Sequence, residues 1–165
     1  MNFNQYLNES AKTEKDIPGY NIVHHLLGMA GEYFSEVFTE DMIDNPEGLV
    51  EELGDFMWYF AGYCRCRDIE ISTLITKPGV FGDFTPQCIG AILEHEKKVL
   101  LGSKEFDKKQ ITYLMNNIYY NIKANLVDFG SSMEECLRKN IEKLAKRYPE
   151  GTFNLQDAIN KADEG

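Results

Sequence analysis

Basic residues are scarce in this chain. Its 165 residues include 17 lysines and arginines against 27 aspartates and glutamates, which gives a formal net charge of −10. Proteins that bind nucleic-acid polymers usually present a basic face, because phosphate neutralisation supplies much of their affinity. The sequence therefore predicts no nucleic-acid polymer as a partner. A small phosphorylated ligand remains compatible with this charge if a bound cation supplies positive charge at the site.

Long apolar runs are absent as well. No stretch has the roughly 20 apolar residues that a membrane-spanning helix needs. The residues after Met1 are mostly polar, which is not typical of a signal peptide. We therefore expect no membrane partner and a cytoplasmic protein.

Sulfur and imidazole ligands are few. The chain has four cysteines, no C-x-x-C pair and three histidines, which argues against a zinc site. Cysteines of cytoplasmic proteins stay reduced, so all four are interpreted as free thiols: Cys64, Cys66, Cys88 and Cys136. A di-iron bundle needs Glu-x-x-His on paired helices, and no histidine here follows a glutamate at that spacing. His24 and His25 are therefore interpreted as packing or surface residues.

Alternation of apolar and polar residues with period two is also missing, so the sequence predicts an all-α fold. Hydrophobic residues make up 43% of the chain, enough for the core of a single domain over residues 1–165. Asn45 before Pro46 is typical of an N-cap followed by proline at the first helical position. Ser132 with Glu135 is typical of a capping box. With similar signals elsewhere, these predict helices at about 3–12, 17–38, 45–67, 85–102, 107–128, 132–148 and 155–161.

A weak internal repeat suggests how these helices are grouped. At an offset of 61 residues, 56–59 aligns with 117–120, while Glu52 aligns with Tyr113 and Asp55 with Asn116. We expect a helical hairpin at about 18–70 and a degenerate second hairpin, without the acids, at about 85–130. The two tandem helical hairpins would form a four-helix core. A separate C-terminal helix would follow at about 132–148, and the longest loop would span 76–84.

Two predicted helices carry clustered carboxylates in stretches without lysine or arginine. Glu32 and Glu36 are four residues apart in one stretch, and Glu52 and Asp55 are three residues apart in the other. Each pair shares a helical face. Ionised carboxylates in apolar surroundings are costly unless they are paired or bind metal. The pattern therefore predicts that these four residues hold Mg²⁺, with Mn²⁺ as a substitute. The alternative is that they lie at wet helix edges and pair with basic residues elsewhere.

A basic face near the C-terminal end could complement these acids. Lys143 and Arg147 are four residues apart on one helical face, and Asn140 precedes them on it. Arginine grips phosphate in a bidentate way and lysine acts as a point charge, so this face is predicted to bind a triphosphate. The alternative is that basic residues in a last helical turn only complement the helix dipole.

Three segments together resemble the MazG-like nucleotide pyrophosphohydrolases of the all-α NTP pyrophosphatase superfamily. The family patterns are G-L-x-G-E-x-x-E, then E-E-L-x-D-x-x-W-Y, then N-x-x-K-L-x-x-R-Y-P-x-G-F. Here they correspond to residues 28–36, 51–59 and 140–151. The opening of the chain also resembles the family's F-N-x-Y-x-x-x-A-x-x-T start. The middle, roughly 73–131, matches only as a degenerate second hairpin.

The resemblance implies a MazG-like helical bundle and Mg²⁺-dependent hydrolysis of a nucleoside triphosphate to a monophosphate and pyrophosphate. It implies metal-binding catalytic roles for Glu32, Glu52 and Asp55, with Glu51 as a weaker candidate for a base or an outer-sphere partner. Substrate and phosphate contacts are expected from Asn140, Lys143, Arg147 and Tyr148. Trp58 and Tyr59 could stack on a base, although aromatic residues at helical spacing are more often core. The family's habit also implies a homodimer, and the alternative is that the tandem hairpins make the monomer self-sufficient.

One departure leaves a rival prediction open. The family places the second acid of its first motif three residues after the first, where this chain has Ser35, and the acid follows at Glu36. Either Glu36 substitutes as a ligand, or the site is one ligand short. The rival prediction is a catalytically weakened helical module that binds nucleotide or protein. Convergence of the carboxylates at metal-bridging distance would favour the enzyme.

Overall fold

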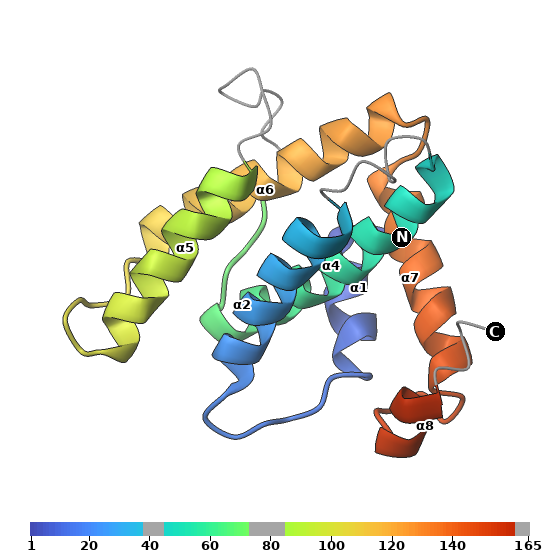
Figure 1. The fold of residues 1–165 in the computed structure, drawn as a ribbon, viewed down its shortest axis with the longest axis horizontal. Coiled ribbons are helices and arrows are strands. Elements are labelled where there is room, and N and C mark those ends of the chain that lie inside the picture. Colours follow the sequence, from blue (N-terminus) through green and yellow to red (C-terminus); the bar gives the residue numbers. More distant parts are fainter. Residues whose placement is uncertain (38–44, 73–84, 161–165) are drawn as a thin grey trace.

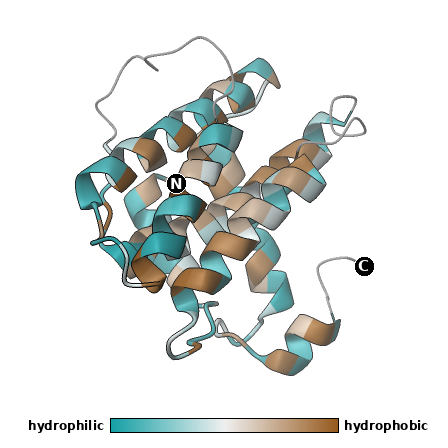
Figure 2. Cartoon of the chain, turned by 60° about the vertical axis from the view of Figure 1, so that its left-hand side comes forward, coloured by the Kyte–Doolittle hydropathy of each residue, from teal (hydrophilic) through white to brown (hydrophobic). Residues whose placement is uncertain are grey.

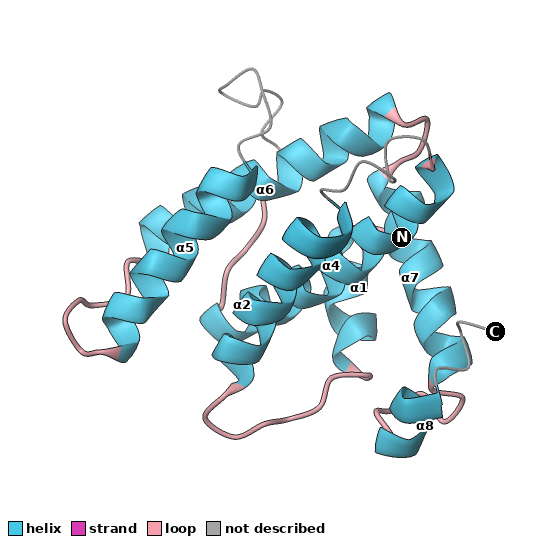
Figure 3. Ribbon diagram, viewed as in Figure 1, coloured by secondary structure: helices cyan, strands magenta, loops and turns pink. Residues whose placement is uncertain are grey.

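All regular elements of the described chain are helices. The computed structural model describes residues 1–37, 45–72 and 85–160, and no strand occurs in these ranges (Figure 3). The elements in chain order are α1 (Phe3–Ala11), α2 (Asn21–Gly31), the π-helical η1 (Glu32–Val37), α4 (Pro46–Arg67), α5 (Thr85–Leu100), α6 (Lys108–Asp128), α7 (Met133–Arg147) and α8 (Leu155–Asn160). The predicted all-α class is confirmed for these residues. The predicted loop at 76–84 lies outside them.

The predicted helix starts are set by local hydrogen bonds. The Asn45 side chain accepts a hydrogen bond from the backbone N–H of Gly48 at the start of α4, where Pro46 is the first helical residue. The Ser132 side chain likewise accepts a hydrogen bond from the backbone N–H of Glu135 at the start of α7. Such caps satisfy backbone donors that have no partner inside the helix. The predicted N-caps of these two helices are confirmed, while the Glu135 side chain pairs with Lys139 rather than closing a capping box.

The second predicted helix differs from its expectation. It begins at Asn21 rather than at residue 17, after Gly19, whose φ of +79° is not helical. At Glu32 it changes from α-helical to π-helical hydrogen bonding. A π-helix is rare and occurs mostly in single turns, often at functional sites. The change therefore coincides with the first predicted metal ligand.

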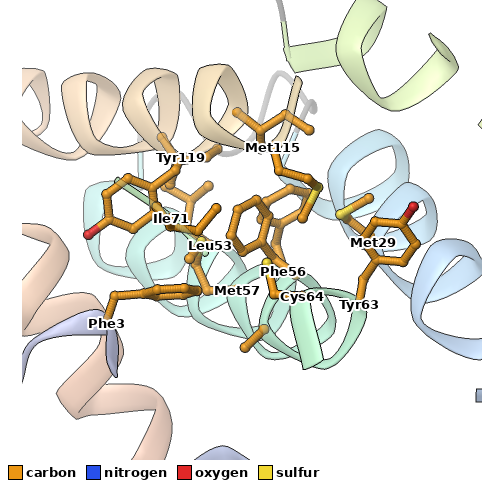
Figure 4. Close-up of a cluster of buried hydrophobic side chains, with 14 of the residues drawn as sticks. Phe3, Met29, Leu53, Phe56, Met57, Tyr63, Cys64, Ile71, Met115 and Tyr119 are labelled. Carbon is orange, nitrogen blue, oxygen red and sulfur yellow. The ribbon is translucent and has the colours of Figure 1, made fainter. Parts of the chain in front are cut away.

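Helix α4 is the central element. Figure 1 shows α2 beside α4 and α5 beside α6, and α1 and α7 also pack on α4. Buried residues occur around most of its circumference, among them Leu53, Phe56 and Met57, which meet side chains from α1, α2 and α6 in the core (Figure 4). Hydrophilic and hydrophobic residues are interleaved along the helices (Figure 2). The four acids in the first half of α4, Glu47, Glu51, Glu52 and Asp55, are not among these buried residues.

Helices α2 and α4 approach closely because each has a glycine beneath an aromatic ring of the other. A Cβ atom on Gly28 would overlap the Tyr59 ring, and one on Gly62 would overlap the His25 ring. A larger residue at either position would push the helices apart. This crossing fixes the position of Glu32, four residues after Gly28, relative to the acids of α4.

A buried ion pair connects α4 to the hairpin of α5 and α6. Glu96 of α5 has a side chain that is only 1% exposed, and it pairs with Arg67 at the end of α4. The hydroxyl group of Tyr63 donates a 2.5 Å hydrogen bond to the same carboxylate. Asn116, which aligns with Asp55 in the repeat, accepts a hydrogen bond from the Ser72 backbone N–H at 2.8 Å. At the position that the predicted repeat aligns with Asp55, α6 thus has an amide side chain that contacts the backbone.

Two further expectations concern the whole chain. All four cysteines are free, and Cys64, Cys88 and Cys136 are buried. Within the described ranges, no helix has both the length and the apolar character required to pass through a bilayer.

We predict that Gly62→Ala destabilises the protein by about 1–3 kcal/mol, because the added methyl group must displace the His25 ring in a packed crossing. The matched control is Gly90→Ala in α5, where a Cβ atom would meet nothing within 4 Å. That change should stabilise the protein by up to about 1 kcal/mol, because alanine favours a helix. Urea unfolding of both variants measures the difference. Equal effects would contradict the proposed packing constraint.

Candidate metal centre

Three predicted carboxylates converge where α2 ends against α4. Glu32, Glu52 and Asp55 each offer an oxygen atom, and these oxygens all lie within 4.8 Å of one another. Glu52 and Asp55 share one face of α4 because they are three residues apart. Glu32 reaches them because the glycine-mediated crossing brings α2 close to α4. The two helices thus place three acids in one cluster.

The acids raise one another's pKa. Burial, followed by the nearby charges of Asp55, Glu52 and Glu36, raises the pKa of Glu32 to about 7, against an opposing effect of Lys143. Burial, followed by the charge of Asp55, also raises the pKa of Glu52. Two or more carboxylates in one site cannot all ionise without cost. The three carboxylates therefore need more positive charge nearby before all of them can ionise at low cost.

Lys143 supplies part of this positive charge. Its Nζ atom lies 2.8 Å from Asp55 Oδ2 and 2.8 Å from Glu51 Oε1. Burial raises the pKa of Asp55, while the hydrogen bond and charge of Lys143 lower it less strongly. Burial opposes the charge of Lys143, but its hydrogen bonds to Asp55 and Glu51 outweigh this effect and raise its pKa. Asp55 and Glu51 thus pair with a basic residue from a distant part of the sequence, as the alternative prediction described.

Glu32 and Glu52 differ from Asp55 in this respect. Among the described residues, no lysine or arginine forms an ion pair with either. Lys143 reaches only the side of the cluster formed by Asp55. A cation bound between the three carboxylates would complete the neutralisation.

Glu36 lies at the periphery of this cluster. Its side chain is exposed, and it is not one of the three residues whose oxygens lie within 4.8 Å of one another. Its charge nevertheless raises the pKa of both Glu32 and Glu52. Hydrogen bonds in a π-helix join residues i and i+5, so its turn holds more residues than an α-helical turn. The π-helical η1 therefore favours Glu36 over Ser35 on the face of Glu32, and its role as a ligand stays a prediction.

Asn140 contacts Asp55 of the acid cluster, and its predicted contact with substrate stays a prediction. Its side chain is only 3% exposed. Its Nδ2 atom donates a 2.9 Å hydrogen bond to Asp55 Oδ1, and its Oδ1 atom accepts one from the Tyr6 hydroxyl at 2.6 Å. The amide therefore lies behind Asp55 and supports it.

A cavity of about 280 Å³ opens beside the cluster. Glu32 and Asp55 form its acidic side, and Arg147 contributes a predicted basic residue. Aromatic side chains make up much of the remaining wall: Trp58, Tyr59, Tyr148 and Phe153. Trp58 and Tyr59 are thus partly exposed cavity walls, where the sequence favoured core packing. The cavity combines acids, a guanidinium group and aromatic faces.

The N-terminal segment contributes cavity residues that the sequence reasoning missed. Thr13, Lys15 and His24 line it. Thr13 accepts a 3.1 Å hydrogen bond from the Trp58 indole N–H, which fixes one aromatic wall. Lys15 Nζ lies 5.6 Å from the centre of the Phe153 ring. Thr13 is the final residue of the family-like opening motif, so that motif was the available signal.

A second group of potential ligands lies nearby. Glu14, His25 and Cys66 each offer an atom within 4.8 Å of the others. The two oxygens of Glu14 already bind His25 Nε2 and Arg65 Nη2, both at 2.5 Å. Burial opposes the charge of Glu14, but the hydrogen bonds from His25 and Arg65 outweigh it and lower its pKa to about 2. We interpret this group as a structural ion pair that anchors the N-terminal segment on α4.

The donor atoms of the main cluster suit a hard divalent cation. Mg²⁺ and Mn²⁺ prefer carboxylate oxygens and commonly share their coordination sphere with phosphates. Glu32, Glu52 and Asp55 supply only such oxygens, and they leave room on the side of the cavity. The residues present therefore fit the metal that the sequence predicted.

Comparisons with protein-family models, with curated proteins and with solved structures found no match.

We predict that Glu14→Gln destabilises the protein by about 2–3 kcal/mol at pH 7, because it weakens the contacts to both the buried His25 ring and the partly buried Arg65 guanidinium group. The folded-state pKa of Glu14, about 2, lies below its ordinary value. Its contribution is therefore present above pH ~4.5 and is lost as the pH falls towards 2. Thermal unfolding from pH 2 to 7 should show the variant and the wild type converging in acid. Exposed Glu9, changed to Gln, serves as the control, and a constant gap at all pH values would contradict the prediction.

Proposed function

We propose that this protein is a Mg²⁺-dependent nucleoside triphosphate pyrophosphohydrolase, which releases a nucleoside monophosphate and pyrophosphate. The observation that carries the proposal is the convergence of Glu32, Glu52 and Asp55, with oxygens within 4.8 Å, beside a cavity that holds Arg147. A MazG-like arrangement of two hairpins is part of the proposal. In it, α2 with α4 forms the hairpin that carries the acids, and α5 with α6 forms the degenerate one.

The acids are assigned to the metal. Glu32, Glu52 and Asp55 would hold it, and Glu36 would add an outer ligand through the π-helical turn. Mg²⁺ bound there supplies charge neutralisation for phosphates and lowers the pKa of a coordinated water. The pKa of Glu32 is raised to about 7, so its ionised form is unfavourable in this site. A bound cation would stabilise that form.

The basic residues are assigned to the triphosphate. Lys143 is held by Asp55 and Glu51 at 2.8 Å, at the edge of the acid cluster. A cation on Asp55 would take over part of the role of Lys143, which would leave the ammonium group available to an anion. Arg147 lines the cavity and can bind phosphate oxygens in a bidentate way. Together the two stabilise the negative charge of the departing pyrophosphate.

Aromatic walls are assigned to the nucleoside. The cavity of about 280 Å³ is slightly smaller than the range of roughly 300–1,000 Å³ for ligand pockets. Trp58, Tyr59 and Tyr148 offer flat faces to a base. Thr13 and His24 offer polar groups for its edge. A single nucleoside beside an acid cluster suits these dimensions better than a polymer does.

A second candidate function is a nucleotide-binding or protein-interaction module without catalysis. The observation that favours it is the pairing of Lys143 with Asp55, together with the exposed position of Glu36 outside the tight cluster. In that case the ion pair would be the permanent neutralisation of Asp55, and a nucleotide would bind without being cut.

A homodimer belongs to the proposal as well. Large apolar side chains are exposed on the surface of the first hairpin: Tyr20 at 65%, Leu27 at 64% and Phe34 at 49%. Such side chains are candidates for contact with a second copy of the chain. Sedimentation velocity at several protein concentrations would show whether the chain associates.

The decisive experiment is an assay of pyrophosphate and monophosphate release. Purified protein is incubated with Mg²⁺ or Mn²⁺ and a panel of ribo- and deoxyribonucleoside triphosphates. We expect metal-dependent release of both products from at least one nucleotide. Asp55→Asn should reduce the rate by at least about 100-fold, because it removes a ligand charge. Glu51→Gln should have a smaller effect, since Glu51 contacts Lys143 and has a side chain that is 53% exposed.

The control variant is Glu9→Gln, on the exposed face of α1, which should retain the wild-type rate. Release of neither product from any nucleotide, with either metal, would refute the enzyme. Nucleotide binding measured calorimetrically without turnover would then support the second candidate.

A further inference from the structure

A fully buried tyrosine of α1 lies behind the acid cluster. The Tyr6 side chain is 0% exposed. Its hydroxyl oxygen lies 2.6 Å from Asn140 Oδ1 and 3.5 Å from the Gly54 carbonyl oxygen. A hydroxyl group has one proton to donate. The much shorter distance assigns that proton to Asn140.

This hydrogen bond sets the orientation of the Asn140 amide. An asparagine amide can be rotated by half a turn, which exchanges its oxygen and nitrogen. With Oδ1 bonded to Tyr6, Nδ2 must face the opposite side, where it donates to Asp55 Oδ1 at 2.9 Å. The reverse orientation would place two oxygens against each other at Asp55, and the Tyr6 hydroxyl would have to accept from Nδ2 and turn its proton to the Gly54 carbonyl oxygen, 3.5 Å away. The hydroxyl of Tyr6 therefore favours, together with Asp55 itself, the orientation that supports a carboxylate.

Asp55 is thereby held at both of its oxygens. Oδ1 accepts from Asn140, and Oδ2 accepts from Lys143 at 2.8 Å. Lys143 is a flexible point charge that an anion can attract away, whereas Asn140 is 3% exposed and fixed. The Asn140 contact is thus the durable one, and it depends on a residue from a helix that contributes no carboxylate to the cluster.

We infer that Tyr6 is a positioning residue for Asp55, acting through Asn140, and that its hydroxyl tunes the affinity of the acid cluster for a divalent cation. The effect on the cation rests on the proposed function. The positioning itself does not, because the side chains of Tyr6, Asn140 and Asp55 are joined by hydrogen bonds in the structure. Outer-sphere partners of this kind commonly change metal affinity by about 10–100-fold.

The backbone around Gly54 adds to this arrangement. A Cβ atom on Gly54 would lie 3.1 Å from Asn140 Cβ, so α4 and α7 are close at this point. Asn140 consequently has little freedom to move away from Asp55 once its amide is oriented. The hydrogen bond from Asn140 to Asp55 then depends on the orientation of the amide, which the hydrogen bond from Tyr6 favours.

The first test measures Mn²⁺ binding by electron paramagnetic resonance of the free ion. Tyr6→Phe keeps the buried ring and removes the hydroxyl, and we expect it to weaken Mn²⁺ binding about 10-fold. The matched control is Tyr119→Phe, which alters a ring of the same core, 5.3 Å from Phe3, and should leave the affinity within about 2-fold. Asp55→Asn should abolish binding. Wild-type affinity in Tyr6→Phe would overturn the effect on the cation.

The second test needs no metal. A double-mutant cycle compares the free energies of unfolding of Tyr6→Phe, Asp55→Asn and the double variant. We expect the effects of Tyr6→Phe and Asp55→Asn to be non-additive, although no hydrogen bond joins the two side chains directly. In an Asn140→Ala background we expect the two effects to be additive. Additive effects in the wild-type background would overturn the positioning role. If the wild type fails to bind Mn²⁺ while the coupling is present, the proposed function fails and the positioning role stands.

Discussion

The close crossing of α2 and α4 is the constraint on which the site depends. It exists because Gly28 and Gly62 leave space for the Tyr59 and His25 rings. Two helices with side chains at these positions would lie farther apart. The distance matters because Glu32 comes from one helix and its partner acids from the other. A packing feature of the core thus determines an electrostatic feature of the surface.

Charge is balanced in this cluster only in part. Three carboxylates meet one nearby ammonium group, Lys143, which already interacts with Asp55 and Glu51. The remaining imbalance is expressed in the raised pKa of Glu32, caused first by burial and then by its acidic neighbours. A protein can tolerate such a site when a cation or a proton completes it. The cluster is therefore more costly to the fold than an ordinary exposed group of acids.

Local signals predicted much of the fold, because helix starts depend on neighbouring residues. Asn45 and Ser132 cap their helices through hydrogen bonds to residues three positions later. The acid cluster was predictable since its residues lie in stretches without basic side chains. The π-helical η1 was not predictable, because it depends on how the end of α2 packs on α4. The roles of Asn140 and Tyr6 were also hidden, because they join residues separated by 134 positions.

That separation has a consequence for biosynthesis. Asp55 is completed by Asn140 and Lys143 of α7, while the amide of Asn140 is oriented by Tyr6 of α1. Contacts between such distant parts of a chain form late, because a long loop must close first. A nascent chain that has exposed only α1 to α4 outside the ribosome therefore carries the acids without their supports. The hydrogen bonds that support Asp55 form only when α7 packs on α4, late in folding.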